Sequence, residues 1–201
     1  MRLLGTACVL AFALALPARG DVTFQLTQPV INTLTPIDSL PSSQQINTAF
    51  NNSPSEALAN LQQLAYPTNF VDRGVQLRAV RALIHYCATT PCSFSDPAHD
   101  TLRQIATNPK YRDSRSGSDL LVLRAAIESR GVLRVPLDVD ILEPQLQHPS
   151  RDIRAAVARA LRDLGNTHAI ALLRARYNIE DTEQVKIAIS DALRVLGQPV
   201  P

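Results

Sequence analysis

The sequence predicts an all-α fold, an α-solenoid of about four antiparallel helix pairs that follows an irregular N-terminal cap. In residues 152–165 the apolar residues recur at the spacing i, i+3, i+4, i+7, i+8 and i+11, which is one face of a helix. The same pattern returns 32 residues later, in residues 184–197. A fixed period of this length is typical of stacked repeats. The chain has 201 residues, of which 45% are hydrophobic, and this is enough to build a core.

The same apolar pattern occurs twice more upstream, 34 and 78 residues before residues 152–165. It predicts two earlier second helices, near Ala126–Gly131 and Val75–Leu83. Gly165, Gly197 and, by this alignment, Gly131 stand at helix ends, where glycine readily adopts the left-handed conformation. The first helices of the four pairs are expected at residues 55–64, 97–105, 137–146 and 168–177.

The third pair resembles a HEAT repeat. Leu142–Leu146, with Pro144 in the middle, is similar to the kinked first helix of that family, because proline removes a helical hydrogen bond. Ile153-Arg154 and Ala160-Leu161 are similar to its second helix, whereas the first unit has Gln76 in place of the usual arginine. The period of 32–34 residues is shorter than the roughly 40–47 of full HEAT units. It is similar to that of the short HEAT-like repeats of phycobilisome lyases.

Residues 1–20 have the layout of a secretory signal peptide. A basic Met1-Arg2 precedes the apolar run Leu3–Leu16, and small residues place a cleavage site near Gly20/Asp21. The alternative is a membrane anchor, but this run is shorter than the roughly 20 residues needed to span a bilayer. The sequence therefore predicts a secreted or periplasmic protein without a transmembrane segment after cleavage.

Residues 21–52 differ in composition from the repeat domain, which is expected at residues 53–201. Prolines punctuate a stretch rich in Thr, Ser and Gln, in which Ser42 or Ser43 could cap a short helix. Ile46, Ala49 and Phe50 would share one face of that helix. The segment is expected to cap the first repeat, because a terminal repeat needs its apolar face covered. The alternative is an arm that docks a partner.

Two cysteines remain after cleavage, Cys87 and Cys92, and they flank a turn-forming stretch. A local disulfide that pins the end of a helix is the simplest interpretation in an oxidising compartment. The rival interpretation is a redox-active pair, although the spacing is not Cys-x-x-Cys.

The sequence contains no pattern that specifies catalysis, a metal site or a cofactor. The four histidines, His85, His99, His148 and His168, are scattered and are expected at the surface or at helix ends. Removal of Arg2 and Arg19 would leave 18 basic against 18 acidic residues, so net charge gives no support for binding to nucleic acid. We expect no enzyme, no cofactor and no nucleic-acid partner.

One surface carries a functional hypothesis. In HEAT-like stacks the second helices line the concave side, so their non-core positions form the expected binding face. The helical period predicts an excess of basic residues there, suited to an acidic protein surface or segment. The alternative is a ladder of arginines that bridge to acidic residues of neighbouring helices. The residues of this predicted basic face are Arg73, Arg81, Arg151, Arg154, Arg159, Arg162, Lys186 and Arg194.

Together these observations predict a non-catalytic scaffold that mediates protein–protein interaction within an envelope or extracellular assembly. The resemblance to lyase-type HEAT-like repeats implies the alternative, an enzyme or enzyme accessory. The sequence leaves the partner and the oligomeric state open.

Overall fold

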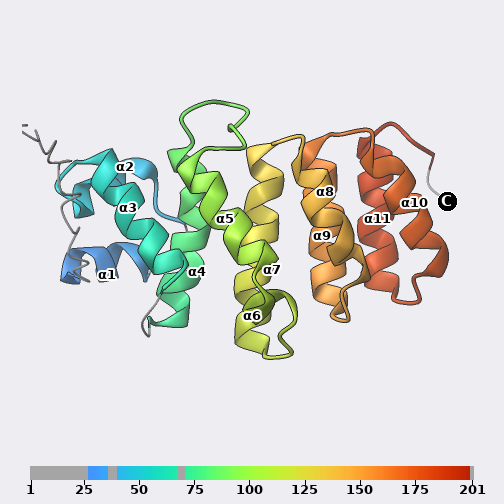
Figure 1. Ribbon diagram of the computed structural model, residues 1–201, viewed down its shortest axis with the longest axis horizontal. Coiled ribbons are helices and arrows are strands. Elements are labelled where there is room, and N and C mark those ends of the chain that lie inside the picture. Colours follow the sequence, from blue (N-terminus) through green and yellow to red (C-terminus); the bar gives the residue numbers. More distant parts are fainter. Residues whose placement is uncertain (1–26, 36–39, 68–70, 200–201) are drawn as a thin grey trace, which may run out of the picture.

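The computed structural model describes residues 27–35, 40–67 and 71–199, and within these ranges all regular secondary structure is helical. The helices stand side by side in a row along the longest axis of the molecule (Figure 1). The predicted all-α solenoid is therefore confirmed. The α-helices are α1 (Gln28–Leu34), α2 (Ser43–Ala49), α3 (Pro54–Ala65), α4 (Arg73–Ala82), α5 (Pro97–Thr107), α6 (Pro109–Arg112), α7 (Gly117–Leu133), α8 (Asp138–Leu142), α9 (Arg151–Leu164), α10 (Ala169–Ile179) and α11 (Glu183–Val195). Two 3₁₀ helices extend α4 and α8, namely η1 (Leu83–Tyr86) and η2 (Glu143–Gln147).

The four second helices, α4, α7, α9 and α11, pack against one another in chain order and form one layer. The contacts of α9 with α7 and with α11 are far more extensive than its contacts with α8 or α10. Small side chains allow this close packing, since Ala155, Ala156, Ala158 and Ala160 of α9 are fully buried. The first helices lie beside this layer, so the apolar faces of α7 and α9 are shared between their own units and both neighbouring units.

Side-chain caps explain where several helices begin. The Asp72 carboxylate accepts hydrogen bonds from the backbone N–H groups of Gly74 and Val75 at the start of α4. Asp96 caps α5 through the N–H of Ala98. At the other end, Gly165 and Gly197 have φ angles of +70° and +75°, which confirms their predicted role after α9 and α11.

The third glycine of that alignment does not end its helix. Gly131 lies inside α7, which continues to Leu133, and Arg134 takes the left-handed conformation with φ of 56°. A Cβ atom on Gly131 would lie 2.7 Å from the Cα atom of Ala160. The glycine is required here because α7 and α9 approach each other closely, so the prediction for Gly131 is wrong.

The described part of the N-terminal cap contains two short helices, α1 and α2, and α2 is the short helix that was predicted after Ser42. The hydroxyl of Ser42 accepts from the N–H of Gln45 at the start of α2, and the Gln45 side chain accepts from the N–H of Ser42. Val30 and Leu34 of α1 and Ile46 of α2 are buried in the common core.

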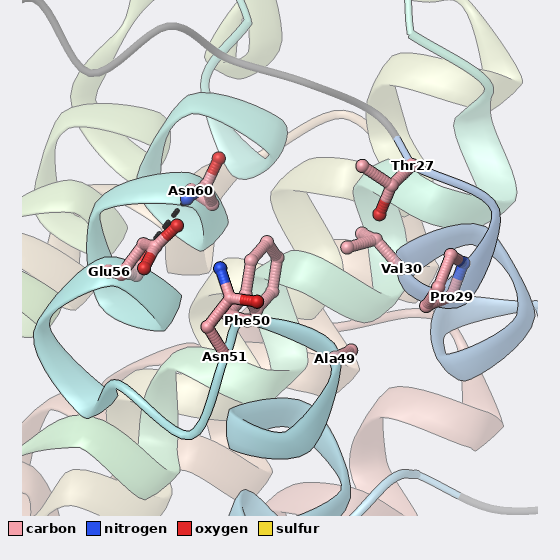
Figure 2. A pocket seen from close by; sticks show the side chains of 8 residues that line it. All are labelled: Thr27, Pro29, Val30, Ala49, Phe50, Asn51, Glu56 and Asn60. Carbon is pink, nitrogen blue, oxygen red and sulfur yellow. Dashed lines mark hydrogen bonds between the residues drawn. The ribbon is translucent and has the colours of Figure 1, made fainter.

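A pocket of about 420 Å³ opens between this cap and α3 (Figure 2). Its lining combines Val30 and Phe50 with the polar groups of Glu56 and Asn60. The predicted signal peptide and its cleavage site lie outside the described residues. Among the helices that are described, none has the length and apolar character needed to cross a bilayer.

Candidate functional site

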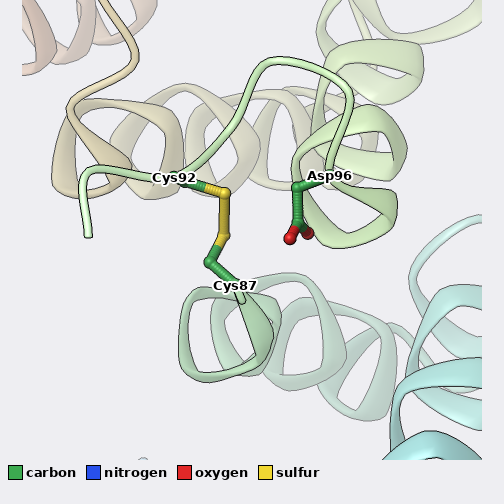
Figure 3. Close-up of side chains that lie close together, drawn as sticks. All are labelled: Cys87, Cys92 and Asp96. Atoms are coloured by element: carbon green, nitrogen blue, oxygen red, sulfur yellow. A yellow bond between two sulfur atoms is a disulfide. The ribbon is translucent and has the colours of Figure 1, made fainter. Parts of the chain in front are cut away.

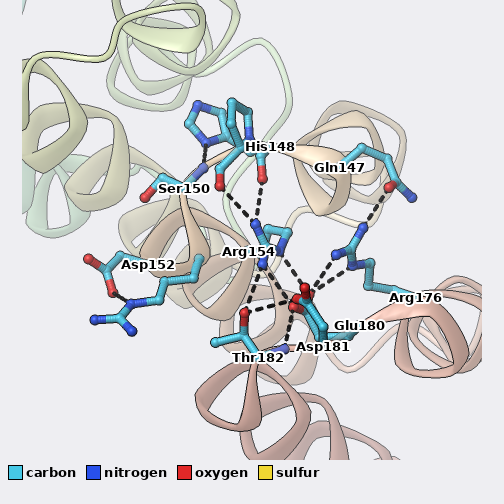
Figure 4. Close-up of polar contacts among 11 residues, drawn as sticks. Gln147, His148, Ser150, Asp152, Arg154, Arg176, Glu180, Asp181 and Thr182 are labelled. Atoms are coloured by element: carbon cyan, nitrogen blue, oxygen red, sulfur yellow. Dashed lines mark hydrogen bonds and ion pairs between the residues drawn. The ribbon is translucent and has the colours of Figure 1, made fainter.

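Arg154 does not lie on an exposed face. Its side chain is 9% exposed, and its Nε and Nη2 atoms each donate to one carboxylate oxygen of Glu180 at 2.8 Å (Figure 4). Its Nη1 donates to the backbone carbonyls of His148 and Pro149, both at 2.9 Å. Arg154 therefore ties the turn of its own unit to the next unit, and its assignment to the basic face is wrong.

Glu180 is saturated by the groups around it. Arg176 donates to Oε2 at 2.7 and 2.9 Å, and the N–H of Thr182 donates to Oε1 at 3.0 Å. The hydrogen bonds from Arg154 lower the pKa of the Glu180 carboxyl far below its ordinary range, and in return the pKa of Arg154 is raised. A carboxylate held between two guanidinium groups in this way stays ionised at all physiological pH values.

The equivalent position of the first unit makes the same two kinds of contact. The Nε2 atom of Gln76 donates to the carbonyl of Ala65, at the end of α3, and to the hydroxyl of Tyr111 in the next unit. Gln76 is buried as well. This position of the second helix points toward the turn between helices and not toward solvent, which is why helical periodicity alone misplaced Arg154.

Three other arginines of the predicted face pair with acids on neighbouring second helices. Arg73 of α4 lies 2.7 Å from Asp119 of α7. Arg162 of α9 lies 2.7 Å from Asp191 of α11 and 2.8 Å from Asp163 on its own helix. A weaker pair joins α9 to α7, with 3.5 Å between Arg159 and Glu128. These ion pairs connect the successive second helices α4, α7, α9 and α11, whose layer we call the inner layer.

Four members of the predicted face remain more open. Arg151 and Arg194 have side chains that are 65% and 70% exposed; Arg151 lies 4.0 Å from Asp152, and Arg194 contacts Asp191. Arg81 is exposed at the C-terminal end of α4. The ammonium group of Lys186 lies 5.7 Å from the centre of the Tyr177 ring. The surface is thus a band of alternating charges with exposed arginines and not a continuous basic groove.

The sequence of these packed units matches a known family. Residues 114–194, which include α7 through α10 and α11 up to Arg194, match the family model described as HEAT repeats. This segment is a stack of HEAT repeats. No curated protein matches the chain. The HEAT segment contains the interhelical pairs of Arg154, Arg159 and Arg162, and the units built from α3 to α5 continue the same row on its N-terminal side.

A buried polar cluster lies where the first HEAT helix, α7, meets α5 and α8. The side chains of His99, Arg130 and Asp138 have no exposed surface. The Oδ1 atom of Asp138 accepts from Arg130 and lies 2.9 Å from Nε2 of His99. His99 lies in the first turn of α5, so the predicted helix-end position is confirmed, although its ring is buried and paired. The signal was present in the alignment, because the 34-residue shift places Arg130 on the apolar position of Leu164.

His148 is also buried and holds the turn before α9. Its Nε2 lies 2.9 Å from the carbonyl oxygen of Arg112, and its Nδ1 accepts from the N–H of Ser150 at 3.0 Å. A carbonyl oxygen can only accept, so Nε2 carries the proton and the ring is neutral. Burial lowers the pKa of His148. His148 caps the end of η2, so its predicted helix-end position is confirmed. Its ring is buried because, like the ring of His99, it satisfies buried backbone groups.

Cys87 and Cys92 are joined as a disulfide directly after η1, with 5.5 Å between their Cα atoms (Figure 3). Asp96 lies beside them, and the three residues are grouped closely enough to suggest metal ligands. The sulfur atoms are bonded to each other, however, and the Asp96 oxygens accept from the N–H groups of Ala88 and Ala98. This arrangement fastens the loop between η1 and α5, and it leaves no set of ligands for a metal.

Proposed function

We propose that this chain is a non-catalytic scaffold that binds a protein partner on the face formed by α4, α7, α9 and α11. The HEAT repeats of residues 114–194 support this proposal, because proteins of stacked helical repeats present extended surfaces for binding. The single observation that carries it is the series of ion pairs between successive second helices. Arg73–Asp119, Arg159–Glu128 and Arg162–Asp191 hold neighbouring helices in register, so the face is organised before a partner arrives.

The partner that suits this face has acidic side chains. Arg81 and Arg151 are exposed, and the weak contact of Arg151 with Asp152 at 4.0 Å competes little with a new carboxylate. Guanidinium groups bind carboxylates in a bidentate manner, which gives orientation as well as attraction. Since the band also contains acids, we infer recognition of a segment with acidic residues at matching intervals, not of a uniformly acidic polymer.

The place of action that we propose is the periplasm or the extracellular space. The apolar run after Met1-Arg2 and the small residues before Asp21 support export. The Cys87–Cys92 disulfide is compatible with an oxidising compartment, where such bonds persist.

The test uses the purified protein as bait on the envelope and extracellular fractions of its native cells. The combined variant Arg81→Glu with Arg151→Glu changes exposed groups only, and we expect it to reduce capture of the specific partner by about tenfold or more. The matched control is Arg174→Glu, an exposed arginine on α10 outside the inner layer, which should leave capture unchanged.

Equal capture by the wild type, the double variant and the control would refute binding through this face. Variants of Arg154 or Arg162 are unsuitable for this test, because their ion pairs stabilise the fold.

A further inference from the structure

The outer side of α11, at the C-terminal end of the row, repeats a surface that is buried one unit earlier. In α9, Ala155 and Ala158 are fully buried. The 32-residue shift places Ile187 and Ser190 at the same positions of α11. Ile187 is 60% exposed, because α11 is the last described helix of the stack (Figure 1). A surface that is buried on α9 is thus repeated on α11, where it is largely exposed to solvent.

Four residues form a straight stripe on this side of α11. Glu183, Ile187, Ser190 and Arg194 follow the spacing i, i+4, i+7 and i+11, which places them on one face of the helix. All four line the same shallow depression, to which Tyr177 of α10 also contributes. We call these four residues the α11 stripe.

The α11 stripe is complementary to itself when two helices run antiparallel. A two-fold axis at the midpoint between residues 188 and 189 brings Glu183 opposite Arg194 of a second copy. The same axis brings Ile187 opposite Ser190, so a large apolar side chain meets a small one. Because the contact is symmetric, each pairing occurs twice. Like charges therefore do not face each other at either end of the stripe.

We propose that two copies of this chain associate through the α11 stripe in an antiparallel, two-fold arrangement. The stripe carries one acid and one base, so it does not select a partner of strong net charge, whereas it matches its own copy at all four positions. Arg194 already contacts Asp191, but its side chain is 70% exposed and such surface pairs are worth little, so it can turn to a new carboxylate.

The expected dimer is weak. With 13 residues, α11 is roughly 20 Å long, and a single pair of such helices buries less surface than a standard stable interface. Association is therefore expected only at protein concentrations on the order of 10 to 500 µM. Arg194 belongs both to this stripe and to the face that is proposed to bind the partner. The two proposals can still fail separately, because partner capture is tested at Arg81 and Arg151 and dimerisation is tested at Glu183 and Arg194.

Sedimentation equilibrium of the purified protein over this concentration range tests the proposal. The wild type should move from the mass of a monomer toward that of a dimer. Glu183→Arg and Arg194→Glu should each weaken association by about tenfold or more, because each places like charges opposite each other. Mixing the two single variants in equal amounts should restore the dimer, since every charge then faces its opposite. The double variant Glu183→Arg with Arg194→Glu should also dimerise.

The control is Arg81→Glu on α4, which should dimerise like the wild type. Circular dichroism of each variant checks that the helices are retained, and the double variant keeps the test decisive if one single variant folds poorly. A wild type that remains monomeric at 500 µM would overturn the proposal. Single variants that dimerise like the wild type, or a mixture that remains monomeric, would overturn it as well.

Discussion

The Nε2 atom of His99 lies 2.9 Å from the Oδ1 atom of Asp138, and neither side chain has any exposed surface. Arg130 donates to the same oxygen. The other ring nitrogen of His99 lies 2.9 Å from the carbonyl oxygen of Phe94, which can only accept, so Nδ1 carries a proton. Three helices, α5, α7 and α8, are thus joined by one buried polar cluster. Two nitrogens of Arg130 and Oδ2 of Asp138 have no partner among the described residues.

Asp138→Asn tests what this cluster contributes. The variant keeps the size of the side chain but removes the charge opposite the buried guanidinium of Arg130, so we expect the free energy of unfolding to fall by about 3–5 kcal/mol. Denaturant titration measures it. Asp140→Asn, at an exposed position of the same helix, is the control and should change stability by less than about 0.5 kcal/mol.

The cluster also predicts the effect of removing both charges at once. Arg130→Met combined with Asp138→Leu leaves no buried ion, and we expect this pair to cost less stability than Asp138→Asn alone. A double variant that is less stable than the single one would show that the ion pair has a net stabilising effect beyond its own desolvation.

Gly131→Ala should weaken the contact between α7 and α9. The added Cβ would lie 2.7 Å from the Cα and 3.0 Å from the carbonyl oxygen of Ala160, and backbone atoms cannot move aside cheaply. We expect a loss of about 1–3 kcal/mol in the free energy of unfolding, as for other overpacked sites. Gly117→Ala is the matched control, because nothing lies within 4 Å of its Cβ position and alanine favours helix. Equal stability of the two variants would contradict the close approach.

Glu180→Gln should destabilise the contact between α9 and the turn that joins α10 to α11. Arg154 is nearly buried and would lose its ionised partner, so we expect a loss of about 3 kcal/mol or more at pH 7. The pKa of Glu180 is lowered on folding, and the stability that it provides is present above the unfolded value of about 4.3 and lost as the pH falls below it. The variant should therefore lose less stability than the wild type between pH 5 and pH 3. An equal loss of stability in the wild type and the variant between pH 5 and pH 3 would contradict this role.

The repeat period predicted the helices better than it predicted their outward faces. A shift of 32 residues located α9 and α11, including the left-handed Gly165 and Gly197, because the apolar spacing and the helix ends are local properties. Pro144 correctly indicated the break in the first helix of the third pair, where α8 is followed by η2. These features depend on residues close together in the chain, so one sequence is enough to predict them.

The contacts between units could not be predicted in the same way. Arg154 lies at a position that a helical wheel assigns to solvent, yet it is covered by the turn that carries Glu180, 26 residues later. Gly131 was assigned to a helix end, although the close approach of Ala160 from α9 is its reason. Both depend on how neighbouring units are rotated against each other, which the apolar spacing of one helix does not specify.

His148 should make the protein less stable in mild acid. Burial is the main cause of its lowered pKa, and the charge of Arg154 lowers it further. The backbone hydrogen bonds with Arg112 and Ser150 and the charge of Asp113 partly offset this shift. A group whose pKa is lower in the folded state binds its proton more readily when unfolded. Its contribution is therefore complete well above the unfolded value of about 6.5 and decreases as the pH falls through it. Protonation of Nδ1 would also break the hydrogen bond from the N–H of Ser150.

The measurement is the free energy of unfolding at pH 8 and at pH 5.5, a window that lies above the titration of Glu180. His148→Gln should be less stable than the wild type at pH 8 but should lose less stability between the two values. Burial lowers the pKa of His85 as well, so His85→Gln is the comparison that separates the two rings. The pKa values of His148 and His85 are both lowered, so both residues should make the wild type less stable as the pH falls. A wild type whose stability stays constant or rises as the pH falls from 8 to 5.5 would therefore contradict a neutral, buried His148.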